Sequence, residues 1–517
     1  KEKESDAYKK ETIHAIEAIL RAEFPPHKAY YVSGLTAIEY YYGRYMQDDF
    51  KAFVPLIFVV ITVILLINFR SIIAALLPLC SIAMSLLWTL GFMVACGISL
   101  NNVTTIIPPI LVAVTVADSI HFVGDALQRA HKAQYSPMQS KTVLRETMQN
   151  LFIPCFLTSI TTVFGFFSLT KINIVPIQEL GIVTAAGTFF AYIITFTFLP
   201  AVIEQFNLFP HVLSFTPGST HFFKERIDRF LIRLSQFNER HYRAVVIGVV
   251  MVTLLSLLGM MRLKTETSVL EYFKKDSPIY RDTQYIEKHL SGVHFLNVSL
   301  KAETEDFFRS PDMLKKIEQL QQFVERLPEV DTSTSAVDYL KEINKSFHNE
   351  DEASYVIPES RELIAQYLLL YGADDLDDFV NTQWNWTTIR IRLNEHTTTA
   401  LSRVMGIIDD YLAVHFQAPV KATYVGQTVL EVESNEAVTK GQISSVVLAM
   451  LTVFGLMFVA FRSFFLGIIS IVVNVLPLLV NFGIMGLCSI RLNSATAMIA
   501  AIGIGIVVDD TIHFIHQ

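Results

Sequence analysis

Five ionisable side chains lie in two strongly apolar stretches of the chain. Asp118 and His121 belong to the first stretch, and Asp509, Asp510 and His513 belong to the second. A charged side chain at the centre of a membrane-spanning helix costs about 3 kcal/mol on insertion scales, so it is expected to have a function. Residues three or four positions apart share one face of a helix. Each stretch is therefore predicted to present an acid and an imidazole together, as a proton carrier requires.

The two stretches are copies of one unit, because a constant offset of 392 residues relates them. The offset pairs Asp118 with Asp510 and His121 with His513. It also pairs Arg70-Ser71 with Arg462-Ser463, Gly91 with Gly483, Leu100-Asn101 with Leu492-Asn493, and Thr104 with Thr496. Ala117 stands where the second copy has Asp509. The acid shared by both copies is thus Asp118 in one and Asp510 in the other, and Asp509 is specific to the second.

Polar residues next to these acids extend the predicted site. Where two copies adjoin, like charges in a small space of low dielectric constant cannot all ionise cheaply, so some carboxylates should hold a proton. Thr115, Ser119 and Thr511 are candidates to relay protons or to orient the carboxylates. Polar side chains between helices can also serve only as hydrogen-bonding contacts. For His121 and His513, a position at the cytoplasmic interface is an equally good interpretation.

The composition is that of a membrane protein. Of the 517 residues, 52% are hydrophobic and 17% are charged, which is typical of chains with many membrane spans. A formal net charge of -8, without a basic stripe interleaved with aromatic residues, excludes a nucleic-acid partner. The phosphate-binding sequence of ATP-driven proteins does not occur. Energy for any transport would have to come from another source, and no cofactor is expected.

Nine apolar segments are long enough to cross a bilayer as helices. They are residues 52–69, 72–96, 103–123, 151–169, 180–203, 244–261, 443–461, 464–489 and 495–515. If the spans alternate, the short loops rich in Lys and Arg fall on one side, which predicts that this side is cytoplasmic. The chain is therefore expected to be a multi-pass protein of the inner (cytoplasmic) membrane, with its large soluble region outside.

The soluble region between the sixth and seventh of these segments alternates strand-like and helix-like patterns. Strands are predicted at 293–300 and 386–393, and helices at 311–327 and 397–416. These patterns indicate an α+β domain of the split βαβ, ferredoxin-like kind. Because the 392-residue offset assigns partners beyond both ends of the chain, we expect an internal portion of a twelve-span protein with duplicated parallel halves.

The linker at 205–243 is predicted to lie on the cytoplasmic side and to contain an amphipathic helix. Apolar residues including Phe230, Leu234 and Phe237 recur at helical spacing among arginines. Such a helix either lies on the inner leaflet or packs against the helix bundle. The sequence favours neither interpretation.

The duplicated unit, with a large outer domain after the first span and carboxylates on the fourth span of each half, resembles the resistance-nodulation-division superfamily. The residues from Gly503 to Phe514 are most similar to its predicted-exporter branch, near the mycobacterial large membrane proteins, the hopanoid transporters and Dispatched. The resemblance implies a polytopic α-helical exporter driven by the proton motive force, with H⁺ as coupling ion. Its porter domains would collect a hydrophobic or amphiphilic substrate from the outer leaflet or the periplasm.

The same resemblance assigns the domains. They are 1–50, the end of a first extracytoplasmic porter domain; 51–204, spans 2–6; 205–243, the cytoplasmic linker; 244–261, span 7; 262–441, a second extracytoplasmic porter domain; and 442–517, spans 8–10. The expected partners are membrane lipids and the substrate. A homo-oligomer and a complex with a periplasmic protein both fit this architecture.

Two other functions fit parts of the pattern. A non-transporting lipid receptor of the sterol-sensing type, or an accessory of protein export, would share the spans but would tolerate Asp118→Asn and Asp510→Asn. A remoter alternative is an intramembrane metal-dependent hydrolase built on the two histidines and the carboxylates. No further His or Cys nearby completes a set of metal ligands, so we expect neither a metal nor an enzyme.

Overall fold

The computed structural model describes most of the chain. The described residues are 6–24, 30–101, 103–132, 140–209, 221–264, 269–371, 376–395, 397–416 and 420–493, with positions 496, 498, 499, 503, 505, 507, 508, 511 and 512. The chain forms two compact units, one of residues 1–45 with 266–436 and one of residues 46–265 with 437–517. We call them the outer unit and the membrane unit.

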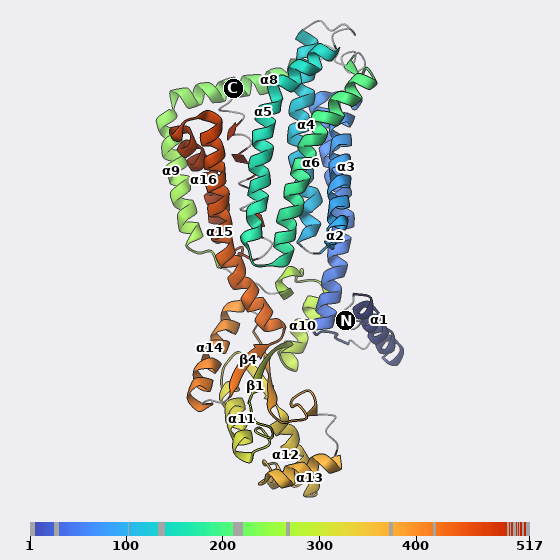
Figure 1. Ribbon diagram of the computed structural model, residues 1–517, viewed down its shortest axis with the longest axis vertical. Helices are drawn as coiled ribbons and strands as arrows, with labels where there is room; N and C mark the ends of the chain where they lie inside the picture. The colour runs from blue at the N-terminus through green and yellow to red at the C-terminus, as the bar shows by residue number, and fades with distance from the viewer. Residues whose placement is uncertain are drawn as a thin grey trace. The chain divides into compact units, whose positions relative to one another are not determined.

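The membrane unit consists of long helices (Figure 1). They are α2 (Leu35–Phe69), α3 (Ile72–Ala95), α4 (Ile107–Lys132), α5 (Ser140–Phe167), α6 (Val175–Gln205), α8 (His221–Arg240), α9 (Tyr242–Met260), α15 (Gln427–Phe461) and α16 (Phe464–Leu487). Among the described residues, eight helical segments are long and apolar enough to cross a membrane, and they coincide with the first eight predicted spans. The chain is therefore a multi-pass membrane protein. The ninth predicted span, 495–515, lies largely outside the described residues and stays a prediction.

Helices α4 and α5 extend beyond the apolar segments predicted from the sequence. The ion pair between Arg129 Nε and Asp125 Oδ2, 2.6 Å apart, joins successive turns of α4, and such pairs stabilise a helix outside the apolar region. Helix α5 likewise begins at Ser140, whose hydroxyl donates to Glu204 at the end of α6 over 2.5 Å. A polar contact thus joins the start of α5 to the end of α6, and an ion pair within α4 stabilises its polar end.

Helices α3, α4, α5 and α6 pack against one another, and small residues allow the close approach. A Cβ atom at Gly187 on α6 would lie 2.6 Å from the side chain of Leu111 on α4 and 2.7 Å from the Thr89 hydroxyl on α3. A second close contact joins α9 to α16, where a Cβ atom at Gly483 would lie 2.7 Å from that of Ser256. Such contacts of small residues are common between membrane helices.

The 392-residue repeat recurs in the local structure. In the first copy, the backbone N–H of Asn101 donates to Thr104 Oγ1 over 2.7 Å, and the N–H of Thr104 donates to Asn101 Oδ1 over 2.9 Å. In the second copy, the same two bonds join Asn493 and Thr496, over 2.8 and 2.9 Å. The two copies therefore form the same loop at these equivalent positions.

The outer unit contains a four-stranded antiparallel sheet. Its strands are β1 (His294–Lys301), β2 (Val330–Thr334), β3 (Trp386–Leu393) and β4 (Lys421–Val425), in the order β2-β3-β1-β4. Its helices are α1 (Asp6–Glu23), α10 (Pro278–His289), α11 (Pro311–Val324), α12 (Ala336–Phe347), α13 (Arg361–Tyr371) and α14 (Thr398–His415). The strand order, with α11 and α14 as crossovers, is that of a split βαβ fold. The two predicted strands and two predicted helices are confirmed, with ends shifted by at most three residues.

Alternation along the strands separates the two faces of the sheet. Leu296 and Val298 of β1 and Ile391 of β3 are fully buried in the core with residues of α11 and α14. Asn297 of β1 and its partner Arg390 of β3 lie on the other face, because successive side chains of a strand point to opposite faces.

Helix α1 and the beginning of α2, up to residue 45, belong to the outer unit. Ile13 of α1 and Ile38 of α2 pack in one buried cluster with Phe273 and Ile279. Hydrogen bonds join the connecting segment to α10, where the backbone N–H of Val32 donates to Asp282 over 3.2 Å. Residues 30–45 are thus an integral part of this unit.

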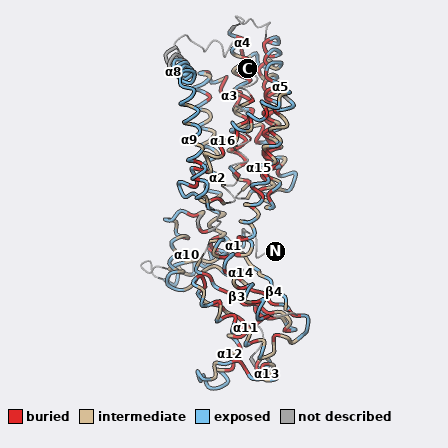
Figure 2. The backbone as a smooth tube through the Cα atoms, turned by 90° about the vertical axis from the view of Figure 1, so that its left-hand side faces the viewer, coloured by how far each residue is buried: buried red, intermediate tan, exposed pale blue. Residues whose placement is uncertain are grey.

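The second half of helix α8, residues 229–240, is exposed. Figure 2 shows the helix in the colour of exposed residues. Large apolar side chains are among them, with Phe230 63% exposed and Phe237 52% exposed. The apolar side chains in this part of α8 are therefore uncovered by the other described residues, and the location of the helix on the inner leaflet stays a prediction.

Candidate functional site in the helix bundle

Asp118 lies inside the bundle of α3, α4, α5 and α6. Its side chain on α4 is 4% exposed, and the Ser159 hydroxyl on α5 donates to its Oδ2 atom over 3.1 Å. A buried carboxylate requires such partners because its charge is poorly solvated in an apolar surrounding. The structure therefore confines the predicted acid to the protein interior and gives it a hydroxyl donor from the neighbouring helix.

The two polar neighbours predicted on α4 are also buried. Ser119 and Thr195 of α6 approach within 3.4 Å through their hydroxyl oxygens. The hydroxyl of Thr115 is fully buried and has no hydrogen-bond partner among the described residues. Thr115 and Ser119 lie one turn apart on one face of α4. Ser159 of α5 therefore binds Asp118 directly, whereas Thr195 of α6 contacts Ser119, the next residue after Asp118 on α4.

Further buried hydroxyl groups lie along α3 and α6, and they were not among the residues predicted from the sequence. Ser81, Ser85 and Thr89 of α3 and Thr184 and Thr188 of α6 are all fully buried. The threonines donate to carbonyl oxygens four residues earlier, for example Thr188 to Thr184 over 2.8 Å. The signal available in the sequence was the recurrence of Ser and Thr every four residues within apolar segments, which places them on one helix face.

Helix α5 contacts both copies of the repeat. Ser159 binds Asp118 of the first copy, and one turn later the Thr162 hydroxyl donates to the carbonyl oxygen of Gly505 in the second copy over 2.9 Å. Ser159 and Thr162 share a helix face. The second apolar stretch therefore passes within one helical turn of the Asp118 contact.

In the second copy, the described part of the site is Thr511. Its hydroxyl donates to Asn474 Oδ1 on α16 over 2.9 Å, so it links the last segment to α16. Asp509, Asp510 and His513 lie outside the described residues. Their place in the site stays a prediction.

His121 differs from Asp118 in its exposure. Its side chain is exposed, although it lies three residues from the buried acid. The described residues contain no group of three or more His, Cys, Asp or Glu side chains that could hold a metal ion. Asp509, Asp510 and His513 lie outside the described residues, so the metal-dependent alternative is also untested.

Comparison with known proteins agrees with this architecture. Residues 2–209 match the MMPL family. The chain is 19% identical over 303 residues to a membrane protein of Methanocaldococcus jannaschii, covering 56% of this chain and 75% of that protein. The cryo-EM structure of the hedgehog release protein Disp from the water bear Hypsibius dujardini has a similar fold, with a TM-score of 0.56 and 12% sequence identity.

The structural similarity covers 91% of this chain, which spans 61% of the length of the Disp chain. At that identity the similarity shows the fold alone. The resemblance predicted from the sequence is confirmed: over residues 2–209 the chain matches the MMPL family of the resistance-nodulation-division superfamily, a family of membrane transporters, and its fold is Dispatched-like.

Proposed function

We propose that the protein moves a hydrophobic or amphiphilic substrate out of the membrane, driven by the proton motive force. The observation that carries the proposal is the buried carboxylate of Asp118, bound by Ser159 within the bundle. An ionisable residue inside a membrane protein typically marks an ion or proton path. The buried hydroxyl groups around it can bind or pass a proton.

The mechanism follows from the position of α5 between the two copies. Protonation of Asp118 removes a buried charge and weakens the hydrogen bond that its carboxylate accepts from Ser159. Through Thr162, the same face of α5 contacts the second copy at Gly505. A change in protonation can thereby alter the contact between the repeated halves, and one half would then rock against the other. The proton path also includes the acids and histidines that the 392-residue repeat pairs with one another or places beside these pairs. They are His121, Asp509, Asp510 and His513.

The predicted orientation assigns the remaining parts. The outer unit is the extracytoplasmic porter region that collects substrate, and the basic loops face the cytoplasm. The protein resides in the inner membrane. Helix α8 lies on the inner leaflet, since its apolar side chains at 229–240 have no other described cover and apolar faces flanked by arginines bind membrane interfaces.

Transport by Asp118→Asn tests the proposal. The full chain is reconstituted into vesicles with an imposed pH gradient, and movement of a fluorescent lysophospholipid is followed. Asp125→Asn is the matched control, because Asp125 lies two turns further along α4 and pairs with Arg129 at 2.6 Å. We expect Asp118→Asn to abolish gradient-driven movement and Asp125→Asn to retain it. Equal movement by both variants would contradict proton coupling through Asp118, and no movement by the wild type would favour a non-transporting lipid receptor.

A further inference from the structure

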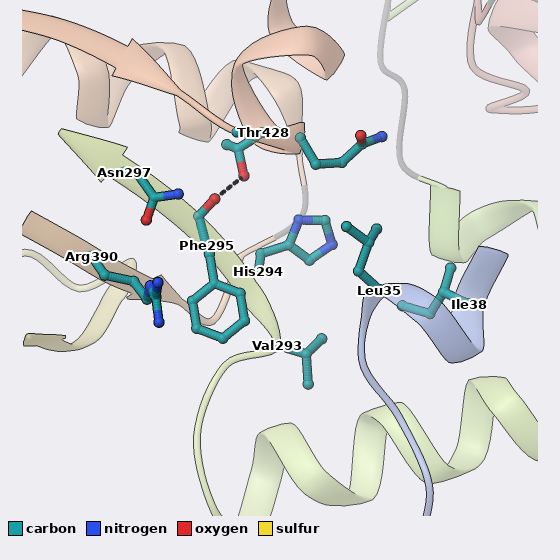
Figure 3. A pocket seen from close by; sticks show the side chains of 10 residues that line it. Leu35, Ile38, Val293, His294, Phe295, Asn297, Arg390 and Thr428 are labelled. Carbon is teal, nitrogen blue, oxygen red and sulfur yellow. Dashed lines mark hydrogen bonds between the residues drawn. The ribbon is translucent and has the colours of Figure 1, made fainter. Parts of the chain in front are cut away.

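A pocket of about 310 Å³ opens in the outer unit, on the polar face of the sheet. Figure 3 shows Phe295, Asn297 and Arg390 of the sheet on one side and Leu35 and Ile38 of α2 on the other. The volume is at the lower end of the range typical of small-molecule sites. All its lining residues belong to the outer unit.

The lining combines apolar and cationic character. Leu35, Ile38 and Phe295 supply apolar surface, whereas Arg390 supplies a positive charge, and the described residues that line the pocket include no Asp or Glu. Asn297 lies directly opposite Arg390 in the register of β1 and β3, so the two side chains share one face. The Oδ1 atom of Asn297 is buried without a hydrogen-bond partner among the described residues. A polar ligand would satisfy this atom.

The guanidinium of Arg390 is able to bind an additional anion. Its ion pair with Asp378 is long, 3.8 Å, and both side chains are open to solvent, 38% and 76% exposed. Exposed pairs of this kind typically contribute only about 0–1 kcal/mol. The ring of Phe379, 5.2 Å from the guanidinium carbon, holds the side chain in place. An arginine fixed in this manner suits a carboxylate or a phosphate.

The pocket touches the first turns of two repeat-related helices. Gly34 and Gly426, at equivalent positions of the two copies, have φ angles of +112° and +121° and directly precede α2 and α15. Leu35 and Ile38 lie in the first turn of α2. In the first turn of α15, the Thr428 hydroxyl donates to the carbonyl oxygen of Phe295 over 2.7 Å. A ligand in the pocket would contact the start of both helices.

We infer that this pocket binds the anionic head group of an amphiphile, a carboxylate or a phosphate, together with the adjoining part of its apolar chain. Arg390 binds the anion, Asn297 binds a neighbouring polar group, and Leu35, Ile38 and Phe295 cover the chain. The inference rests on the proposed function in taking this ligand to be the transported substrate. It adds the head-group charge and the binding residues.

Photolabelling of the full chain in phosphatidylcholine nanodiscs tests the inference. The probes are diazirine-tagged palmitic acid, the corresponding lysophosphatidic acid and the corresponding uncharged fatty alcohol. Labelled peptides are mapped by mass spectrometry, and binding is titrated for each probe. We expect either or both anionic probes to label 35–38 and 293–297, and to bind more tightly than the alcohol.

Variants distinguish the contribution of the Arg390 charge to binding from that of the apolar lining residues. Arg390→Gln should weaken anionic binding about tenfold, as expected for loss of a charge-assisted hydrogen bond, and leave the alcohol unchanged. Arg326→Gln, at an exposed arginine outside the pocket, should change nothing. Leu35→Trp should weaken binding of all three probes, because the larger side chain would fill part of the pocket that Leu35 lines.

Anionic labelling elsewhere in the chain, or unchanged affinity in Arg390→Gln, would overturn the inference. Binding at equilibrium needs no proton gradient. If the anionic probes do not bind in the pocket but transport still requires Asp118, only the inference about the pocket is contradicted. If the anionic probes bind in the pocket but transport does not require Asp118, only the proposed function is contradicted.

Discussion

The hydroxyl of Ser159 on α5 donates to Oδ2 of Asp118 on α4 over 3.1 Å, and both side chains are buried. Ser159→Ala removes this donor and leaves the acid in place. A hydrogen bond to a charged group contributes about 1.5–3 kcal/mol, so we expect gradient-driven transport to fall about tenfold or more. The rate is measured in reconstituted vesicles across a range of pH, and the pH of half-maximal rate should shift.

Thr161→Ala is the matched control for that variant. Thr161 is a buried neighbour on α5 whose hydroxyl donates only to backbone oxygens of its own helix among the described residues, at Leu157 and Thr158. Its replacement should leave the pH profile unchanged. Identical profiles for Ser159→Ala and the wild type would show that this hydrogen bond has no part in proton coupling.

The repeat provides an internal control for helix packing. Gly483 on α16 lies against Ser256 of α9, whereas its repeat partner Gly91 on α3 has no atom within 4 Å of an added Cβ among the described residues. Gly483→Ala should lower the melting temperature of the purified protein by several degrees, since overpacking typically costs about 1–3 kcal/mol. Gly91→Ala should be neutral or slightly stabilising. Equal melting temperatures for the two variants would contradict the α9–α16 contact.

Local patterns predicted much of this protein. Asp118 was recognisable because a charge within an apolar segment is rare, and the gapless offset predicted that Asn101 and Asn493 occupy equivalent positions. The spacing of apolar residues predicted β1 and β3. Each of these signals lies within a few residues of the position it describes.

Contacts between distant segments could not be predicted in the same way. Ser159 is 41 residues from Asp118, and α5 carries several hydroxyl residues that fit its periodicity equally well. Only the packing of α4 on α5 selects Ser159. The pocket likewise depends on Leu35 and Arg390, which line it together although more than three hundred residues separate them in the chain. The exposure of His121 depends on how α4 is rotated within the bundle.

Helix α8 is predicted to contact phospholipid through one face. Phe230, Leu234 and Phe237 recur at spacings of four and three residues, so they share that face. A photoreactive phenylalanine analogue at position 230 should form several-fold more lipid adducts than the same analogue at Ser235, which points elsewhere on the helix. Adducts are identified by mass spectrometry. Protein adducts at position 230, or equal lipid yields at both positions, would contradict this orientation.

Asp282 is predicted to make α10 sensitive to pH. Burial raises the pKa of the Asp282 carboxyl above its ordinary value, against the opposing hydrogen bond from the Val32 N–H. The protonated form is thus favoured in the folded state. The contribution of protonated Asp282 to the stability of the folded state is fully present at pH values below the ordinary carboxyl pKa. It is lost as the pH rises through the raised pKa. Hydrogen exchange in α10 should accordingly increase over that window.

Asp282→Asn should abolish this pH dependence, because the amide does not titrate and its oxygen can still accept from Val32. Asp276→Asn, at an exposed acid just before α10, should retain it. Exchange is measured by mass spectrometry on the peptide spanning α10. Unaltered pH dependence in Asp282→Asn would assign the effect to another group.

Proton movement during transport tests the central claim most directly. The wild type and Asp118→Asn are reconstituted into vesicles that contain a pH-sensitive dye, and an anionic single-chain amphiphile is added without an imposed gradient. Proton coupling predicts that the wild type changes the internal pH as the amphiphile crosses, beyond the change in protein-free vesicles, and that Asp118→Asn does not. Amphiphile movement by the wild type without this proton flux, or an equal flux in Asp118→Asn, would contradict the account.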